Sequence, residues 1–344
     1  MGGMLEILRN AWKIPDLRKK ILITIFLLLI FRVGSFIPVP GLDARALEQL
    51  VASGSLFGFM VIVSGGAFRT ASIFAMSITP YINASIIMQL LTVAIPKLEQ
   101  LAKEGEEGRK IIAQYTRYGT VVLGFLQAVG LYFGLSQAVI EVNAWSFITI
   151  TLTFTAGTAF LMWLGEQITE YGIGNGISML IFAGIVSRGP DGVKALYTTF
   201  ISEQAQGSGI TAVASIAGII LVFLAVITGV VWVQQAERRI PVQYAKRVVG
   251  RKVYGGQSTH IPIKVNLAGV IPIIFAMSIM AFPSTIIGFV APNSTHWFVT
   301  MLRDAQGQIW YALIGAMLVM FLTFFYTMIV FNPVELANNM KKNG

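Results

Sequence analysis

Long apolar segments separated by short polar ones run along most of the chain. Such segments predict membrane-spanning helices when they approach or exceed about 17 residues, because a helix of that length crosses a hydrocarbon core of about 30 Å. Eight segments fit, at about residues 21–37, 73–92, 118–136, 145–164, 175–189, 212–233, 268–290 and 310–331. The fifth is short, and we expect it to extend into its glycine-rich entry.

A further apolar piece, from Leu56 to Phe68, lies between the first two predicted spans. It has about 13 residues, and as a helix it would reach only roughly 20 Å. Gly65 and Gly66 stand near its end, before a lone Arg69. The pattern therefore predicts a half-length helix that enters the membrane without crossing it.

The composition supports a membrane protein. Of the 344 residues, 55% are hydrophobic and only 12% are charged, and the mean hydropathy is +0.73. Soluble domains keep about a quarter of their residues charged. The predicted fold class is therefore all-α, a polytopic bundle of membrane helices. The chain contains no cysteine, which excludes disulfides and thiol chemistry.

The positive charges favour one orientation. Most of the 25 Lys and Arg residues fall in the N-terminal segment 1–20, the loops 97–117 and 234–264, and the C-terminal tail. By the positive-inside rule both ends of this chain are expected in the cytoplasm, which in a bacterium means an inner-membrane protein. The loop 97–117 also carries four acids, so we interpret it as a solvated, self-neutralising connection.

The loop 234–264 is longer and more basic than a simple connection requires. It mixes β-formers with cations and is punctuated by glycines, which predicts a strand-and-turn protrusion. Two interpretations stay open: an orientation signal with some attraction to anionic lipid, or a docking site for an acidic partner or for ribosomal RNA phosphates. The candidate docking residues are Arg238, Arg239, Lys246, Arg247, Arg251 and Lys252.

The sequence lacks the patterns of common enzymes and cofactor sites. His260 and His296 fall in loops predicted on opposite sides of the membrane, so they cannot share a metal ion. The segment "GIGNGIS" at 172–178 superficially resembles a dinucleotide fingerprint, but no strand precedes it, and we expect Asn175 to cap a helix instead. We predict no cofactor, no metal and no enzymatic activity.

Two interrupted spans favour a conduit. The second span reads "ITPYINAS", with Pro80 and Asn83, and the seventh reads "VNLAGVIPIIFAMS", with Asn266 and Pro272. Spans interrupted by proline at corresponding places of two halves are typical of inverted repeats. The two halves are predicted here as residues 1–189 and 190–344. The alternative explanation is the generic tolerance of proline in membrane helices. The alternative function is a small-solute secondary transporter, although no carboxylate lies mid-span to bind an ion.

Several ordered blocks resemble the SecY family, the channel subunits of the bacterial protein-translocation complex. They are "FRVGSFIPVPGLD" (31–43), "SGGAF" (64–68), "SIFAMSITPYINASIIMQLLT" (72–92), "KEGEEGRK" with "QYTRYGT" (103–120), "LMWLGEQITEYGIGNGISMLIFAGIV" (161–186), "ERRIPVQYAKR" (237–247), "STHIPIKVNLAGVIPIIFA" (258–276) and "FFYTMIVFNPVELANNMKK" (324–342). The resemblance extends from about Ile21 to Lys342. The family has ten spans, so it implies that this chain carries eight of them and an incomplete second repeat.

The resemblance implies roles for specific residues. The half-length helix corresponds to the plug, which closes the channel from its exterior side: Leu56, Phe57, Phe59, Met60, Val61, Ile62, Val63, Ser64, Gly65 and Gly66. A constriction of apolar side chains, called the pore ring below, corresponds to Ile78, Ile82, Ile177, Ile181 and Ile274. Such a ring excludes ions by dewetting. Candidate residues of the lateral gate, through which segments pass into the lipid, are Asn83 and Asn266.

The resemblance also implies partners. A passive channel of this kind passes unfolded secretory polypeptides across the membrane and releases membrane segments sideways. We therefore expect SecE and SecG as partner subunits, the SecA motor ATPase or the ribosome docking on the loop 234–264, a signal peptide with its translocating polypeptide, and membrane lipid.

Overall fold

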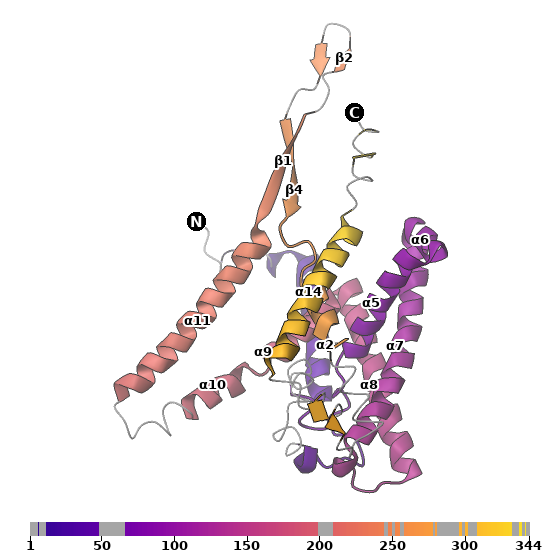
Figure 1. Cartoon of the computed structure of the whole chain (residues 1–344), viewed down its shortest axis with the longest axis vertical. Coiled ribbons are helices and arrows are strands. Elements are labelled where there is room, and N and C mark those ends of the chain that lie inside the picture. Colours follow the sequence, from indigo (N-terminus) through magenta and orange to yellow (C-terminus); the bar gives the residue numbers. More distant parts are fainter. Residues whose placement is uncertain are drawn as a thin grey trace. The chain divides into compact units, whose positions relative to one another are not determined.

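The computed structural model describes residues 6, 12–47, 66–198, 209–243, 247–249, 252–254, 258–277, 279–280, 296–297, 300–301, 308–331, 337–338 and 341 (Figure 1). The chain divides into two compact units, residues 1–192 with 278–311, and residues 193–277 with 312–344. Each unit is described by itself. The predicted halves 1–189 and 190–344, and the inverted repeat between them, stay predictions.

The first unit is a helical bundle in which α5, α7 and α8 lie side by side (Figure 1). Its elements are α2 Pro15–Gly34, α5 Thr79–Ala94, α6 Pro96–Lys103, α7 Glu106–Gly134, the 3₁₀ turn η2 Ser136–Ala138, α8 Ala144–Tyr171 and α9 Gly176–Val186. Helix α10 Gly189–Tyr197 begins in the first unit and ends in the second. Helix α8 is central: in its most apolar stretch 44% of the residues are buried. Threonines and glycines line its buried face, which allows close helix packing.

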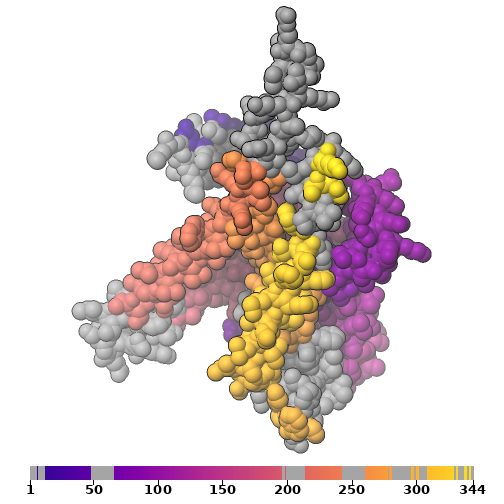
Figure 2. Space-filling view, turned by 45° about the horizontal axis from the view of Figure 1, so that its top comes forward, coloured from indigo at the N-terminus to yellow at the C-terminus, as the bar shows by residue number. Residues whose placement is uncertain are grey.

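The second unit contains α11 Gly209–Gln235, the strands β1 Glu237–Gln243, β2 Arg247–Val249, β3 Lys252–Tyr254 and β4 Ser258–Lys264, and most of α14 Ile309–Val330. Helix α11 is apolar all round, and no residue of its span Ala214–Gln235 is buried (Figure 2). An exposed helix of this composition is stable only when lipid or another protein covers it.

The predicted spans are helical over most of their described parts, but not all reach full length. Among the residues that the structure describes, three helices are long and apolar enough to cross a membrane: Ala144–Tyr171, Ala214–Gln235 and Ile309–Met328. A fourth candidate is the pair α5 and α6, which is bent by 102° at Ile95. Helix α9 has 11 residues, about 16 Å, and begins at Gly176, so the expected extension into the glycine-rich entry is not helical, and the fifth span stays a prediction.

The second predicted span begins later than expected. Residues 73–78 form turns, and α5 starts at Thr79 with Pro80 in its first turn. Proline is favoured at the first helical position because its missing N–H needs no partner there. The predicted connection 97–117 is helical, formed by α6 and the first turns of α7. It is mostly exposed, and its Lys103 and Glu99 form an ion pair of 2.7 Å, which agrees with a solvated, self-neutralising connection.

Residues 66–78, called the turn segment below, form irregular backbone that is mostly buried, with Arg69 and Thr70 exposed. Its backbone groups find partners: the Val39 N–H donates to the Ala71 carbonyl at 2.8 Å, and the Ile73 N–H donates to the Ile37 carbonyl at 3.0 Å. Ala71 and Ser77 have positive φ angles of 49° and 54°. Irregular backbone at membrane depth is tolerated only where protein surrounds it, as it does here.

The strand-and-turn prediction for 234–264 is confirmed. Strands β1 and β4, which follow α11, pair antiparallel from Glu237 opposite Lys264 to Gln243 opposite Ser258, and β2 pairs with β3 in a second two-stranded sheet (Figure 1). Residues 237–264 are called the ribbon below. Pro241 and Pro262 occupy alternate pairs of this ladder. Proline has no N–H to donate, so such positions face outward, which discourages a third strand from joining.

Candidate functional site

Four of the five predicted pore-ring residues come together in one apolar cluster of the first unit. Ile78 is fully buried there with Phe31, Phe74 and Leu180, and the half-buried Ile82, Ile177 and Ile181 pack against it. Helices α2, α5, α8 and α9 and the turn segment supply the cluster. Ile274 is half-buried in the second unit, within the helical residues 271–277. The assignment of these residues to a pore stays a prediction.

Ile177 packs closely on helix α8. A Cβ added at Gly165 would lie 2.5 Å from Ile177 Cδ1, so the isoleucine side chain occupies the space that a larger residue at 165 would need. At Gly176 an added Cβ would lie 1.9 Å from the Gly165 carbonyl oxygen. These two glycines therefore bring α9 into direct backbone contact with α8.

Hydroxyl groups fix the turn between α8 and α9. The Thr169 hydroxyl donates to the Gly165 carbonyl at 2.9 Å and accepts from the Gly176 N–H at 2.8 Å. The Thr24 hydroxyl of α2 accepts from the Ile173 N–H at 3.0 Å. The Asn175 side chain accepts from the Ser178 N–H at 3.1 Å, which confirms the predicted helix cap. Together these bonds hold α9 at one height on α8.

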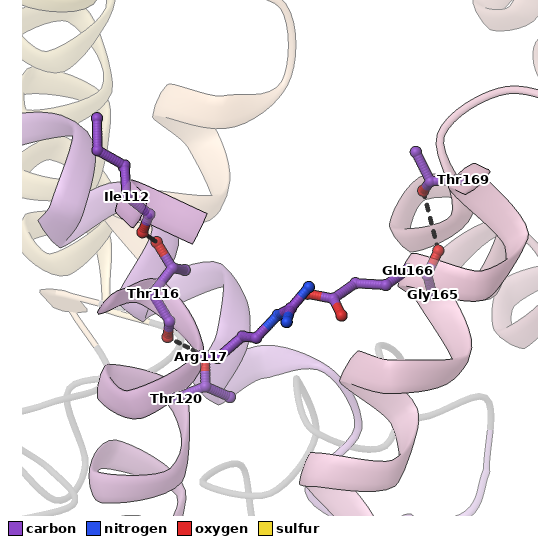
Figure 3. Close-up of polar contacts among 7 residues, drawn as sticks. All are labelled: Ile112, Thr116, Arg117, Thr120, Gly165, Glu166 and Thr169. Carbon is purple, nitrogen blue, oxygen red and sulfur yellow. Dashed lines mark hydrogen bonds and ion pairs between the residues drawn. The ribbon is translucent and has the colours of Figure 1, made fainter. Parts of the chain in front are cut away.

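An ion pair joins α7 to α8 beside this turn. Arg117 Nε donates to Glu166 Oε1 at 2.7 Å, and Glu166 directly follows Gly165 (Figure 3). The side chains are 51% and 25% exposed, so solvent screens the pair. On α7, the hydroxyls of Thr116 and Thr120 donate to carbonyls one turn earlier, which satisfies them inside the bundle (Figure 3).

The turn segment that leads into Ile78 rests against two glycines. A Cβ at Gly157 of α8 would lie 2.0 Å from the Ile73 carbonyl oxygen, and one at Gly34 of α2 would lie 2.0 Å from the Phe74 ring. No larger residue fits at either position without movement. These glycines therefore set how closely the turn segment approaches α2 and α8.

The two candidate gate residues differ in their surroundings. The side-chain oxygen of Asn83 in α5 is buried and has no hydrogen-bond partner among the described residues. The side-chain oxygen of Asn266 accepts from the Gly269 N–H at 3.0 Å and so closes the turn before residue 271. Asn266 therefore has a local structural role, whereas the buried amide of Asn83 is unexplained by local structure.

The plug and docking predictions fall largely outside the described residues. Of the plug, only Gly66 is described, with a φ of +91°. Arg238 and Arg239 are exposed on β1, Arg247 lies on β2 and Lys252 on β3, while Lys246 and Arg251 lie outside the description. Within the parts of the chain described here, no three His, Asp or Glu side chains are grouped to hold a metal ion.

Sequence reasoning missed the contacts made by Gly34, Gly157 and Gly165, and the hydrogen bonds of Thr24 and Thr169. Glycine and threonine are frequent throughout the chain, so their type alone carried no signal. Their spacing on α8 did carry a signal. The intervals between Gly157, Gly165 and Thr169 are about two helical turns and one, which places these small residues toward one side of the helix.

Comparison with known proteins gives a consistent result. The family model described as SecY matches residues 72–344. The chain is 47% identical over 347 residues to the protein translocase subunit SecY of Halalkalibacterium halodurans, covering 99% of this chain and 80% of that protein. It is 48% identical over 339 residues to the subunit of the same name from Escherichia coli K12, covering 96% and 75%.

Solved structures share the fold. One described as a protein conducting channel has a TM-score of 0.63 at 20% identity and covers 91% of this chain and 72% of its own. Another, a SecY protein studied for the role of its plug domain in the closed channel, also has a TM-score of 0.63 at 20% identity, covering 94% and 75%. The fold is thus that of a multi-pass helical membrane channel, and the chain belongs to the SecY family.

Proposed function

We infer that this chain is the central pore subunit of a protein-translocation channel, which passes unfolded secretory polypeptides across a membrane and apolar segments sideways into the lipid. The observation that carries this function is the 47% identity, over 99% of the chain, to a protein translocase subunit SecY. The family is one of channels rather than known enzymes, so the driving energy comes from a partner.

Within that function, the pore ring is the seal. Ile78, Ile82, Ile177 and Ile181 already share one apolar cluster, which supports a common role. Branched apolar side chains around a constriction exclude ions because water does not fill it, yet they yield to a passing chain. By the family resemblance, Ile274 is proposed as a further ring residue and residues 56–66 as the plug.

The ribbon 237–264 is the proposed docking surface for the partner that supplies energy. It presents Arg238 and Arg239 on exposed positions of β1, and more cations follow toward its tip. A Sec61 channel of the same fold has been solved in a canine ribosome–channel complex, which supports a ribosome as one partner. SecA is the proposed alternative motor, and SecE and SecG the proposed partner subunits.

The proposed location is the bacterial inner membrane with the ribbon and both ends of this chain on the cytoplasmic side. The excess of Lys and Arg in those segments supports this orientation. Asn83 is proposed to act at the lateral gate, because its buried oxygen lacks a partner among the described residues. A bond to it would contribute roughly 1 kcal/mol, enough to bias a gate without locking it.

Site-directed crosslinking tests this function. The chain has no native cysteine, so a single Ile82→Cys variant reports on one position only. A polypeptide arrested during translocation is expected to crosslink to Cys at position 82. The matched control is Leu221→Cys on the exposed helix α11. Equal crosslinking at the two positions, or none at 82, would contradict the proposed path.

The seal has its own test. Ile82→Gly is expected to raise the resting ion conductance of reconstituted full-length channels, because a smaller ring loses its dewetting barrier. Ile87→Gly, at an exposed position of the same helix, controls for the loss of an isoleucine. Unchanged conductance in the Ile82 variant, with the plug deleted as well, would make Ile82 a packing residue.

A further inference from the structure

The junction of α8 and α9 has closer packing and more specific hydrogen bonds than a connection between two helices requires. Helix α9 is too short to be held in place by its own length across the membrane. Its position must therefore come from contacts with its neighbours. The contacts are concentrated on one turn of α8, residues 165–169, which lies next to the Arg117–Glu166 ion pair (Figure 3).

Gly165 provides the space that decides where the Ile177 side chain lies. An alanine Cβ there would be 2.5 Å from Cδ1 and 3.5 Å from Cγ1 of Ile177. The close atom is the far end of a side chain, so Ile177 can rotate away without moving the backbone. The nearest atom of any other residue within reach, Leu180 Cδ1, would be at an ordinary 3.4 Å. The substitution therefore acts on Ile177 specifically.

Thr169 sets the height of α9 by a second route. Its hydroxyl accepts from the N–H of Gly176, the first residue of α9, and donates to the Gly165 carbonyl of α8. Gly176 is buried, so its N–H has no access to water as a substitute partner. One side chain thus ties the start of α9 to the same turn of α8 that receives Ile177.

We propose that Gly165 and Thr169 are positioning residues for the channel seal: the turn 165–169 fixes the orientation of Ile177 and the depth of α9, and so the closure of the ring. This inference rests on the proposed role of Ile177 in the ring. By this proposal, two residues of α8 that are not part of the ring control how well it excludes ions, because they contact α9 and position Ile177.

The first experiment measures the resting ion conductance of full-length channels with Gly165→Ala. Forcing Ile177 off its preferred rotamer is expected to raise the resting ion conductance about two- to tenfold. Adding Ile177→Val removes the Cδ1 atom that the new methyl group meets, so the double variant is expected to leak less than Gly165→Ala alone. Gly218→Ala on α11, where an added Cβ meets nothing within 4 Å, is the matched control.

The outcomes separate this inference from the proposed function. If Gly165→Ala leaks no more than Gly218→Ala while Ile177→Gly does leak, the ring stands and the positioning role fails. If Ile177→Gly does not leak either, the ring assignment itself fails. If the double variant leaks as much as Gly165→Ala, the effect does not pass through Ile177, and the inference is overturned.

A second pair of variants tests Thr169 without altering a glycine. Thr169→Val keeps the shape but removes the hydroxyl, so the buried Gly176 N–H loses its partner and a raised leak is expected. Thr169→Ser keeps the hydroxyl and is expected to restore the tight seal. Equal conductance in the Val and Ser variants would show that the hydrogen bonds do not set the seal.

Discussion

The contact between Gly157 and the turn segment gives the sharpest stability prediction. Replacing Gly157 by Ala places a Cβ 2.0 Å from the Ile73 carbonyl oxygen. The close atom belongs to the backbone, so it cannot rotate away as a side chain would. Nearly all real Cβ contacts exceed 3.4 Å, so α8 and the turn segment must separate by more than 1 Å.

That separation has a calculable consequence. Overpacking of this kind costs about 1–3 kcal/mol, and the movement also strains the hydrogen bond from the Ile73 N–H to the Ile37 carbonyl. Alanine is the better helix former by up to about 1 kcal/mol, which partly offsets the loss. At roughly 2–4 °C per kcal/mol for a unit of this size, we expect the melting temperature to fall by several degrees.

The assay is thermal unfolding of the purified protein in detergent, with the Gly218→Ala variant on α11 as control. Position 218 is also helical, and an added Cβ meets nothing there within 4 Å, so this control isolates helix propensity. We expect Gly218→Ala to match or slightly exceed the parent. A Gly157→Ala protein as stable as the Gly218→Ala protein would refute the reasoning that Gly157 is required by close packing.

Three further predictions concern other parts of the chain. A double-mutant cycle with Arg117→Ala and Glu166→Ala should give a coupling of about 0.5–1 kcal/mol that falls with added salt, because both side chains are partly exposed; a coupling insensitive to salt would contradict this. Asn143→Ala, which removes the capping box at the start of α8, should cost about 1 kcal/mol in thermal unfolding and speed hydrogen exchange in the first turn; unaltered exchange there would count against it. Arg251→Glu with Lys252→Glu should weaken binding of SecA or ribosomes, measured at moderate salt by co-sedimentation, and undiminished binding would remove the ribbon tip from the mechanism.

The sequence by itself determined the class of the molecule and several local structures. Long apolar segments require a membrane because no soluble fold buries so much apolar surface at so low a charge. The ribbon followed from β-formers and glycines, and the Asn175 cap from its place before an apolar helix, because both depend on neighbouring residues alone. Pro80 was also a usable signal for the start of α5, although the apolar run before it suggested a longer helix.

Only the tertiary structure decided which residues at a distance need each other. The apolar sequence at 66–78 does not show whether this segment is helical or irregular, because either conformation can bury its apolar side chains against α2 and α8. Gly157 and Gly165 leave no room for a larger side chain only because Ile73 and Ile177 approach them from other elements. The Arg117–Glu166 pair likewise joins residues 49 apart in the chain. Such contacts depend on how helices pack, and packing depends on the shape of both partners, which one local pattern does not contain.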